Sequence, residues 1–498
     1  LTHEEISKDL ARELYKNNPF KQELINQIPG DTVGLARQGD FYDLCRGGHV
    51  SNTGQLKNFK LLGISGSYWR ADRNNQPLQR ITGTAFFSQP ELEEYLTLRQ
   101  AAQLYDHRRI GKQLDLFSFH DEGIGFPFFH PRGKKIINLL VAYMRGVHEQ
   151  HNYQEISTPT MLSDDLWQQS GHYEHYKDKM YFCCIDNRSY AIKPMNCPGA
   201  ILVYKTRPHS YRELPLKLAE FGHVHRHELS GVLHGLLRVR AFTQDDAHIF
   251  CTYNQLEGEI RSILQIIDKT LAAFGFTQVR YAISTKPSNA FGNDELWQRA
   301  TKALENALNQ ESKIYTTKSG EGAFYGPKIE VTIEDSMKRS WQCSTVQVDF
   351  FQPQNFDLTY ITSAGTRERP VLIHQAIFGS LERFFAILLE HHKGNLPVWL
   401  APIQARILAV TDIQIPYAEL LAHQLRSLNL RIEIDRSSDP LAGQIKSAQQ
   451  DRIPWMFIVG KKEAESNTFT LRYLNGKQEP QLTLEQFRNE LPLRLTTT

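Results

Sequence analysis

Cysteine is scarce in this sequence, and long apolar runs are missing. Six cysteines are spread over 498 residues, and no two of them form a CxxC pair. This distribution argues against a disulfide framework and against a zinc finger. No apolar stretch approaches the roughly 20 residues that span a bilayer. We therefore expect a protein of the reducing cytoplasm with no membrane partner.

Familiar catalytic motifs and a strong charge bias are missing as well. The segment GEGAFYGPKIE is rich in glycine but is not a P-loop, because no Ser or Thr follows Lys328. No HExxH motif is present. The formal net charge of +2 neither requires nor excludes a nucleic-acid partner. The chain begins with Leu1, and its first residues do not resemble a targeting peptide, so we expect that an N-terminal portion is missing.

The length of the chain predicts about three domains. Thr2 followed by Glu5 is a capping-box pattern that predicts a first helix. Strand-like pieces then alternate with glycine-rich turns over residues 30–87, which predicts a small α+β unit followed by a linker helix. The middle of the chain combines amphipathic helices with strands joined mainly by turns, as in an antiparallel sheet. From about Leu400 a strand–helix alternation predicts a parallel sheet. The predicted domains are 1–104, 105–397 and 398–498.

One run of alternating residues, RVRAFTQDDAHI, is the most informative segment. In a strand, alternate side chains point to opposite faces of the sheet. One set here is mostly small or apolar and suits a core. The other set suits a ligand with phosphates, a flat ring and an amine, although an internally salt-bridged strand explains it equally well. Its members are Arg238, Arg240, Phe242, Gln244, Asp246 and His248.

Two further arginines have neighbours that favour anion binding. Arg226 precedes Glu228 by two residues, so both share a face, and an arginine can grip a phosphate or carboxylate with two hydrogen bonds. The segment GSLERFF begins a helix with Arg383 in its first turns, where the helix N-terminus also attracts anions. Taken alone, Arg383 is as well explained as a surface salt-bridge partner.

Ordered motifs along the whole chain resemble those of a known family. Pro159 in EISTPTML, the pair Arg226 and Glu228, and GSLER with Arg383 resemble the three signature motifs of class II aminoacyl-tRNA synthetases. KPMNCPG, AFTQDDAHIFC, GEGAFYGPKIE and WLAP resemble, more specifically, the threonyl-tRNA synthetases. The resemblance implies an α+β fold: a class II antiparallel sheet flanked by helices, a partial N-terminal α+β editing domain and a C-terminal α/β anticodon-binding domain.

The resemblance also implies an activity and its cofactors. The expected enzyme is a homodimer, formed through the first motif near Pro159, that activates L-threonine with ATP and Mg²⁺ and transfers it to the 3′ end of tRNA(Thr). One zinc ion on Cys197, His248 and His374 would bind the amino and hydroxyl groups of threonine. Valine lacks the hydroxyl, so such a site rejects it better than an apolar pocket could. Taken singly, each of the three ligands would be explained as an ordinary buried residue.

Roles for other side chains follow from the same resemblance. Arg226 would hold the α-phosphate and the threonine carboxylate, and Glu228 would accept a hydrogen bond from the adenine amino group. Asp246 would accept one from the threonine hydroxyl. The remaining expected roles are stacking on adenine for Phe242, contact with the triphosphate for Arg238 and Arg383, lining of the amino-acid pocket for Gln244, Tyr325 and Gln342, and participation in transfer to tRNA for His172.

The two ends of the chain carry further family-like residues. Cys45 and His49 match half of the paired site with which the family hydrolyses seryl-tRNA. The other half, an HxxxH segment that would lie before Leu1, is absent here, so we expect this editing to be lost. Glu463 and Arg472 match residues that read anticodon bases, and Ser438 stands where an asparagine is usual. Hydrogen bonds to base edges specify sequence, whereas contacts with phosphates only position the nucleic acid.

Other functions remain open at this point. A synthetase-derived RNA-binding regulator would lack ligase activity, and retention of Arg226, Glu228 and Arg383 argues against it. A zinc-dependent hydrolase would need a base beside the metal. A ligase for serine or proline is the nearest alternative, but the Cys–His–His set and Asp246 favour threonine.

Overall fold

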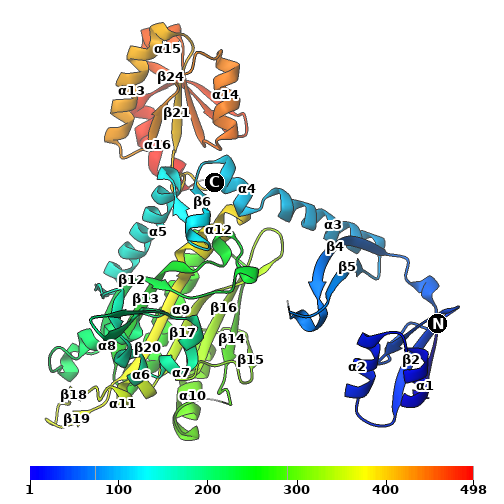
Figure 1. The fold of residues 1–498 in the computed structure, drawn as a ribbon. Helices are drawn as coiled ribbons and strands as arrows, with labels where there is room; N and C mark the ends of the chain where they lie inside the picture. The colour runs from blue at the N-terminus through cyan, green and yellow to red at the C-terminus, as the bar shows by residue number, and fades with distance from the viewer. Residues whose placement is uncertain (73, 289, 497–498) are drawn as a thin grey trace. The chain divides into compact units, whose positions relative to one another are not determined.

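The chain divides into two compact units, residues 1–100 and 101–498 (Figure 1). The computed structural model describes residues 1–72, 74–288 and 290–496. Within these ranges, no helix is both long and apolar enough to cross a membrane. The predicted domain boundaries after residues 104 and 397 stay predictions.

The first unit opens on a three-stranded antiparallel sheet of β1 (Thr2–Ser7), β2 (Thr32–Gln38) and β3 (Phe41–Cys45). Helices α1 (Lys8–Leu14) and α2 (Pro19–Gln27) share a small core with it. The helix predicted from Thr2 is wrong, because all of β1 pairs with β2. The helix starts at Lys8, where the Ser7 hydroxyl accepts a hydrogen bond from Leu10 N.

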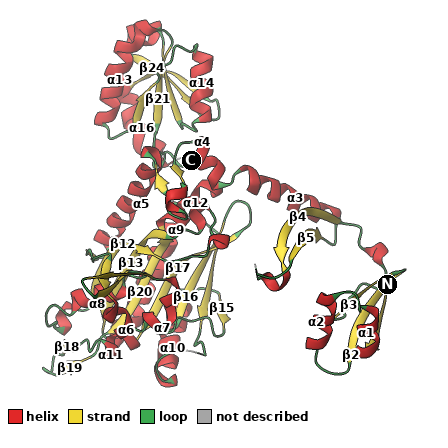
Figure 2. Ribbon diagram, in the orientation of Figure 1, coloured by secondary structure: helices red, strands yellow, loops and turns green. Residues whose placement is uncertain are grey.

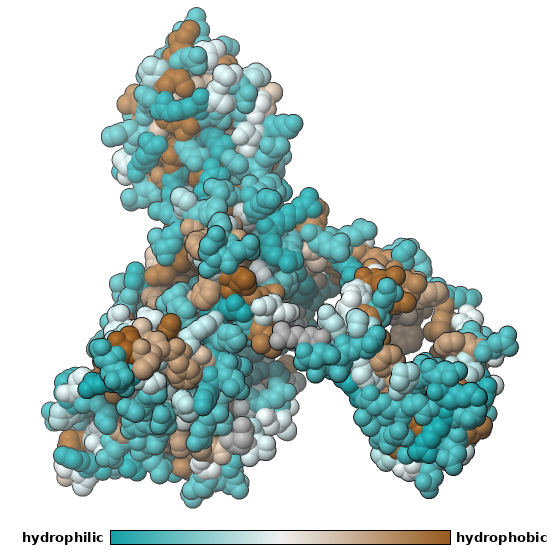
Figure 3. All heavy atoms as spheres, in the orientation of Figure 1, coloured by the Kyte–Doolittle hydropathy of each residue, from teal (hydrophilic) through white to brown (hydrophobic). Residues whose placement is uncertain are grey.

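A hairpin with much apolar surface completes this unit. Its strands are β4 (Phe59–Tyr68) and β5 (Pro77–Ala85), and α3 (Gln89–Leu104) follows them. Phe59, Leu61, Ile64 and Ile81 are all exposed on the hairpin. Brown spheres gather around it in the space-filling view (Figure 3). An isolated two-stranded hairpin has little core of its own.

An eight-stranded sheet is the centre of the second unit (Figure 2). Its pairs are antiparallel except at the two edges, where β15 runs parallel to β14 and β8 runs parallel to β12. The predicted antiparallel sheet is confirmed. In spatial order the strands are β15 (Tyr315–Lys318), β14 (Val279–Ser284), β16 (Lys328–Glu334), β17 (Ser340–Asp349), β20 (Val371–Ser380), β13 (Ala241–Cys251), β12 (Leu216–His225) and β8 (Gln154–Glu155).

The two faces of this sheet differ. Ala247, Ile249, Val346 and Ile373 point to one face, here the packing face, and join a single apolar core with the helices. Residues of opposite parity on the same strands point to the other face, here the site face. The helices of the packing-face core are α5 (Pro131–Gln150), α9 (Leu256–Ala273), α10 (Asp294–Gln310) and α12 (Leu381–His391).

Shorter elements surround the sheet. Helix α8 (Cys197–Tyr204) packs on the site face in a cluster with Leu218, Phe250 and Leu372. A small sheet of β10 (Tyr181–Ile185), β11 (Arg188–Ile192) and β9 (Met161–Ser163) precedes α8 in the chain. The other elements are α4 (His107–Gln113), β6 (Phe117–Ser118), β7 (Phe128–Phe129), α6 (Asp164–Gln169), α7 (His172–Tyr176), α11 (Phe351–Asn355), β18 (Tyr360–Ile361) and β19 (Arg367–Glu368).

The C-terminal part has the predicted α/β pattern with an addition. Strands β22 (Ile432–Ile434), β21 (Ala405–Ala409) and β23 (Trp455–Val459) are parallel, as predicted. Two antiparallel strands, β24 (Thr468–Tyr473) and β25 (Gln478–Thr483), extend the sheet. The helices are α13 (Ile415–Ser427), α14 (Leu441–Gln450), α15 (Lys461–Ser466) and α16 (Leu484–Thr496).

Candidate active site

Cys197, His248 and His374 come together on the site face. Their ligand atoms lie within 4.8 Å of one another, and all three side chains are buried. His248 and His374 are direct cross-strand partners on β13 and β20. Cys197 is the first residue of α8, so its position depends on how that helix packs against the sheet. Strand register and helix packing therefore assemble a group that is spread over about 180 residues of sequence.

The unused atoms of this group fit a metal. His248 Nε2 and His374 Nδ1 are buried, and each lacks a hydrogen-bond partner among the described residues. His374 Nε2 lies 2.9 Å from Asp349 Oδ2, which is the carboxylate–histidine arrangement that orients metal ligands. Burial lowers the pKa of His248, which keeps its imidazole neutral and able to coordinate. One sulfur and two nitrogens suit zinc with an open coordination position.

Asp246 lies beside this group, two residues before His248 on the same strand. Burial raises the pKa of Asp246 to about 6. Its carboxylate accepts a hydrogen bond of 3.1 Å from Asn196 Nδ2. A Cβ on Gly222 would lie only 2.1 Å from Asn196 Oδ1, so only glycine leaves room for this amide. Asn196 belongs to the KPMNCPG motif, but only its contact with Asp246 reveals this role.

Asp245 explains how β20 turns towards helix α12. The pairing of β13 with β20 shifts between Gln244 and Asp246. At this bulge the Asp245 carboxylate accepts hydrogen bonds of 2.7–3.0 Å from three successive backbone N–H groups, those of Ile377, Phe378 and Gly379. Burial raises the pKa of Asp245 to about 8. The side chain therefore has a structural function at the end of β20.

Tyr325 also borders the site, with a partner that had not been predicted. Its hydroxyl donates to Gln347 Oε1. Gln347 lies directly opposite His374 in the sheet, and so on the site face. The predicted Gln342 is exposed on the same strand, opposite Thr332. Cross-strand register, which the sequence does not reveal, singles out Gln347.

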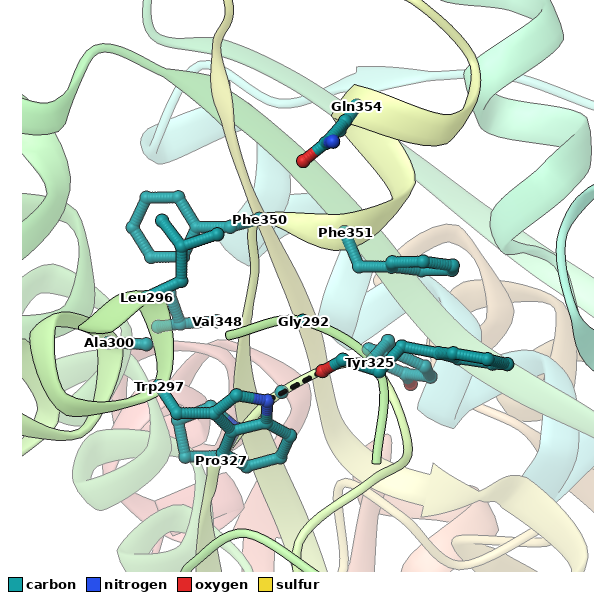
Figure 4. A pocket seen from close by; sticks show the side chains of 12 residues that line it. Gly292, Leu296, Trp297, Ala300, Tyr325, Pro327, Val348, Phe350, Phe351 and Gln354 are labelled. Atoms are coloured by element: carbon teal, nitrogen blue, oxygen red, sulfur yellow. Dashed lines mark hydrogen bonds between the residues drawn. The ribbon is translucent and has the colours of Figure 1, made fainter. Parts of the chain in front are cut away.

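Tyr325 also lines a small, mostly apolar cavity (Figure 4). Its volume of about 20 Å³ holds little more than one water molecule. Trp297 Nε1 donates to the backbone oxygen of Phe291, so this indole has no hydrogen left for a ligand. The cavity is therefore too small and too apolar to bind the substrate of the site.

Arg226 lies beside two aromatic rings and close enough to Asp246 to influence its pKa. Its Nε donates to Pro194 O at 3.1 Å. Its guanidinium carbon lies 5.1 Å from the centroid of Phe242 and 5.8 Å from that of Tyr176. The flat guanidinium is therefore held at the border between Phe242 and Asp246, whose pKa its charge lowers. Gln244 is half-buried on the intervening stretch of β13.

The loop before β13 carries two arginines with different surroundings. Strand β13 begins at Ala241, so Arg238 and Arg240 precede it, and the predicted strand is too long at that end. The predicted alternation still holds there, because Val239 and Ala241 are buried while the two arginines are not. Arg238 Nη2 forms a salt bridge of 2.9 Å with Glu228 and is largely exposed. Arg240 donates to Glu228 O and Ile124 O at 2.9 and 3.0 Å. Arg240 thus holds the loop, whereas Arg238 remains accessible to a ligand.

Arg383 is poised for an anion. It lies in the first turn of α12, where its backbone N–H donates to the Ser380 hydroxyl that caps the helix. Its Nε is buried and has no acceptor in the part of the chain that the structure describes. Burial lowers the pKa of Arg383, and the charge of Arg238 lowers it further. The positive charges of Arg238 and Arg383 repel each other, so the binding of a polyanion between them would be favourable.

His172 is fully buried. Its Nδ1 lies 2.8 Å from Ser170 Oγ, and its ring centroid lies 5.4 Å from that of Phe324 and 6.5 Å from that of Tyr325. Burial lowers the pKa of His172 to about 3. The imidazole is therefore neutral at physiological pH.

The predicted residues near the two termini have local partners. In the first unit Cys45 is partly buried, His49 is exposed, and the rings of His49 and His3 are 6.2 Å apart. In the C-terminal sheet the Glu463 carboxylate accepts from Gly460 N and Thr470 Oγ1. Arg472 Nη1 donates to Gly476 O at 3.3 Å.

Comparisons with known proteins agree with this architecture. Residues 181–392 match the tRNA synthetase class II core domain (G, H, P, S and T), and residues 400–493 match the anticodon binding domain. Residues 33–82 match the second additional domain of threonyl and alanyl tRNA synthetases. A threonine–tRNA ligase of Clostridium botulinum is 49% identical over 98% of this chain and 77% of its own length. One of Acetivibrio thermocellus is 48% identical over 96% of this chain and 75% of its own length.

Solved structures give the same result. The RNA binding domain of threonyl-tRNA synthetase from Cryptosporidium parvum aligns with a TM-score of 0.76 and 38% identity, over 79% of this chain and 99% of its own. A putative threonyl-tRNA synthetase from Aeropyrum pernix aligns with a TM-score of 0.67 and 27% identity, over 79% of this chain and 96% of its own.

Proposed function

The chain belongs to the threonine–tRNA ligases, and on that premise we propose that it activates L-threonine as an adenylate and then charges tRNA(Thr). The single observation that carries this proposal is the buried Cys197–His248–His374 group beside Asp246. A class II synthetase uses ATP with Mg²⁺, and the site face and its loops supply cationic and aromatic groups for ATP.

Activation consists of an in-line attack by the threonine carboxylate on the α-phosphorus of ATP, with pyrophosphate leaving. Arg226 would neutralise the carboxylate and the α-phosphate, since its guanidinium lies between Phe242 and the buried Asp246. Phe242 would stack on adenine, and Glu228 would accept from its amino group. Arg238 and Arg383 would hold the triphosphate. Catalysis of this kind comes mainly from positioning and from stabilisation of charge.

We propose zinc as the resident metal at Cys197, His248 and His374. When bound, the zinc would bind the amino and hydroxyl groups of threonine. Asp246 would accept the hydroxyl hydrogen bond from the other side, held in place by Asn196. Valine would leave this buried polar arrangement unsatisfied, which costs more than a missing methylene in an apolar pocket. Tyr325 with Gln347 and Gln244 would close the amino-acid pocket, while Gln342 stays a weaker candidate because it is exposed.

Threonine-dependent exchange of pyrophosphate into ATP tests the activity, with serine and valine as comparisons. We expect rapid exchange with threonine, slower exchange with serine and almost none with valine. No exchange with threonine would overturn the ligase assignment. Exchange equal for threonine and valine would leave a ligase but remove the proposed hydroxyl recognition.

Further proposals concern the partners. Glu463 and Arg472 would contact anticodon bases, with Glu463 on α15 and Arg472 on β24 of the C-terminal part. A homodimer through the segment near the exposed Pro159 is testable by light scattering in solution. We expect little hydrolysis of seryl-tRNA by this chain, because Cys45 and His49 match only half of the family's paired editing site. His172, neutral and beside Tyr325, remains a candidate for the transfer step.

A further inference from the structure

A buried histidine outside the site, His107, joins the loop that carries Arg238 to the helix that carries Arg383. His107 is the first residue of α4 and is fully buried. Its Nδ1 lies 2.6 Å from Glu390 Oε1, and its backbone N–H donates to the same oxygen at 2.9 Å. Its Nε2 accepts a hydrogen bond of 3.0 Å from the backbone N–H of Leu236.

These contacts determine which nitrogen of the His107 ring carries the proton. Because Leu236 N–H is a donor, His107 Nε2 must be the unprotonated nitrogen. The proton is then on Nδ1, which donates to Glu390. Asp106, His107 and Glu390 have the spacing of a metal site, but both ring nitrogens are already engaged. The group is therefore a hydrogen-bonded connection and not a ligand set.

The loop lies directly against this ring. Gly235 has a φ of +49°, and a Cβ there would meet His107 Nε2 at 2.2 Å and Arg108 Cγ at 2.8 Å. Leu236 and Leu237 are buried beside it. The turn at residues 235–237 thus rests on His107 through backbone atoms, and no side-chain rotation can restore the contact once it is lost.

The same turn positions Arg238. His234 N donates to Arg238 O at 3.1 Å, so the turn closes on itself immediately before the arginine. Arg238 then reaches Glu228. A displacement of residues 235–237 would therefore move Arg238 relative to Glu228.

Glu390 extends the connection to Arg383. It lies in the last turn of α12, whose first turn contains Arg383. Its second carboxylate oxygen accepts from Arg339 at 2.5 Å, and Arg339 also pairs with Asp335. Asp335 in turn accepts from Trp341 Nε1 at 2.8 Å, and the Arg383 guanidinium lies 5.9 Å from the Trp341 ring centroid.

We propose that His107 is a positioning residue for ATP. It holds the 235–237 turn against α12 and thereby fixes the distance between Arg238 and Arg383, the two arginines that would bind the triphosphate. His107 contacts no substrate itself. The inference rests on the proposed function, because it assumes that these two arginines bind ATP.

Two substitutions separate the two hydrogen bonds of the ring. In His107→Asn the amide nitrogen can replace Nδ1 as donor to Glu390, but nothing accepts from Leu236. In His107→Gln the amide oxygen can reach the position of Nε2 and accept from Leu236. His148→Asn is the matched control, since His148 is a buried histidine whose Nε2 has no partner in the described ranges.

The experiment measures pyrophosphate exchange and, separately, calorimetric binding of ATP, which needs no turnover. We expect His107→Asn to raise the KM and Kd for ATP about tenfold, as for one lost buried hydrogen bond, while the KM for threonine changes less than about twofold. His107→Gln should recover much of the ATP affinity, and His148→Asn should leave it unchanged. Thermal unfolding shows that each variant is folded.

Two results would overturn the inference. One is unchanged ATP affinity in folded His107→Asn. The other is an equal loss for ATP and threonine, which is the signature of a general structural defect. Failure of the proposed function is distinct, because it appears as absent threonine-dependent exchange in the unsubstituted protein.

Discussion

The two faces of the eight-stranded sheet use the same strands for different purposes. On β13, Ala247 and Ile249 are fully buried in the packing-face core, where any apolar side chains of fitting volume would serve. Asp246 and His248, on the site face of the same strand, are also buried but polar. Burial therefore does not distinguish the two faces of β13, whereas the polarity of the buried side chains does.

Several buried polar atoms at the site lack partners within the described ranges, although others are found elsewhere, such as Gln375 Nε2 on the packing face. Those at the site include His248 Nε2, His374 Nδ1, Asn196 Oδ1 and Arg383 Nε, none of which has a partner among the described residues. Native proteins leave few such atoms, because each costs about 1–3 kcal/mol. The cost is understandable if a metal, an amino acid and a nucleotide satisfy them. The fold alone gains nothing from this arrangement.

Other buried polar groups on the site face are fully satisfied, beginning with Glu220, which lies directly opposite Asp246 in the sheet. Lys193 Nζ lies 3.0 Å from both Glu220 Oε1 and Thr158 Oγ1, and Thr158 N donates to the same carboxylate. This buried network connects the segment before Cys197 to β12. Its function is to hold the segment in place, since no atom of it is left for a ligand.

The largest expected effect of a single substitution on stability is on the packing face. Ile249→Ala removes a fully buried side chain from the main core and should lower the free energy of unfolding by about 2–5 kcal/mol. Urea unfolding measures this loss. The KM values of the folded enzyme should not change. An altered KM for threonine would show that the two faces are not independent.

A substitution on the site face should change the activity strongly and the free energy of unfolding little. Asp246→Asn keeps the shape of the side chain but removes the charge that would accept the threonine hydroxyl. We expect kcat/KM for threonine to fall about 100-fold, since hydrogen bonds to charged groups contribute about 1.5–3 kcal/mol. Unfolding by urea should change by less than about 1 kcal/mol. Unchanged discrimination against valine would contradict the role given to Asp246.

The smallest expected effect is on the pH dependence of the free energy of unfolding. It comes from buried neutral histidines, which occur on both sides of the sheet. Burial lowers the pKa of His148 to about 4 and that of His172 to about 3, from 6.5. The unfolded chain binds protons at these groups below pH 6.5 and the folded chain does not, so stability is complete above pH 6.5 and decreases as the pH falls towards 4. Each group contributes at most about 1.4 kcal/mol per pH unit.

Urea unfolding at several pH values between 7.5 and 5 tests this dependence. His148→Asn should flatten the profile relative to the unsubstituted protein. An equally steep profile in the variant would assign the acid sensitivity to other groups.

Sequence reasoning predicted the site where it depends on local alternation. The period of two correctly grouped Phe242, Gln244, Asp246 and His248 on one face of β13. The strand is shorter than predicted, since it begins only at Ala241 and leaves Arg238 and Arg240 in the preceding loop. Sequence reasoning failed at Thr2–Ser7, where pairing with β2 outweighs a helix-capping pattern.

Register and packing between distant segments could not be read from the sequence. The group of Cys197, His248 and His374 followed from family resemblance alone. Asn196 and Gln347 were missed, because only the packing of α8 and the pairing of β17 with β20 bring them to the site. The coupling through His107 depends on a contact between residues 283 positions apart in the chain.

The most direct test of the central claim is the metal content of two cysteine variants. The account predicts one zinc per chain in the unsubstituted protein and in Cys251→Ala, whose cysteine lies in the packing-face core. It predicts no zinc in Cys197→Ser, together with the loss of threonine-dependent pyrophosphate exchange. Unchanged zinc content in Cys197→Ser would contradict the assignment of the site face as a metal-dependent threonine site.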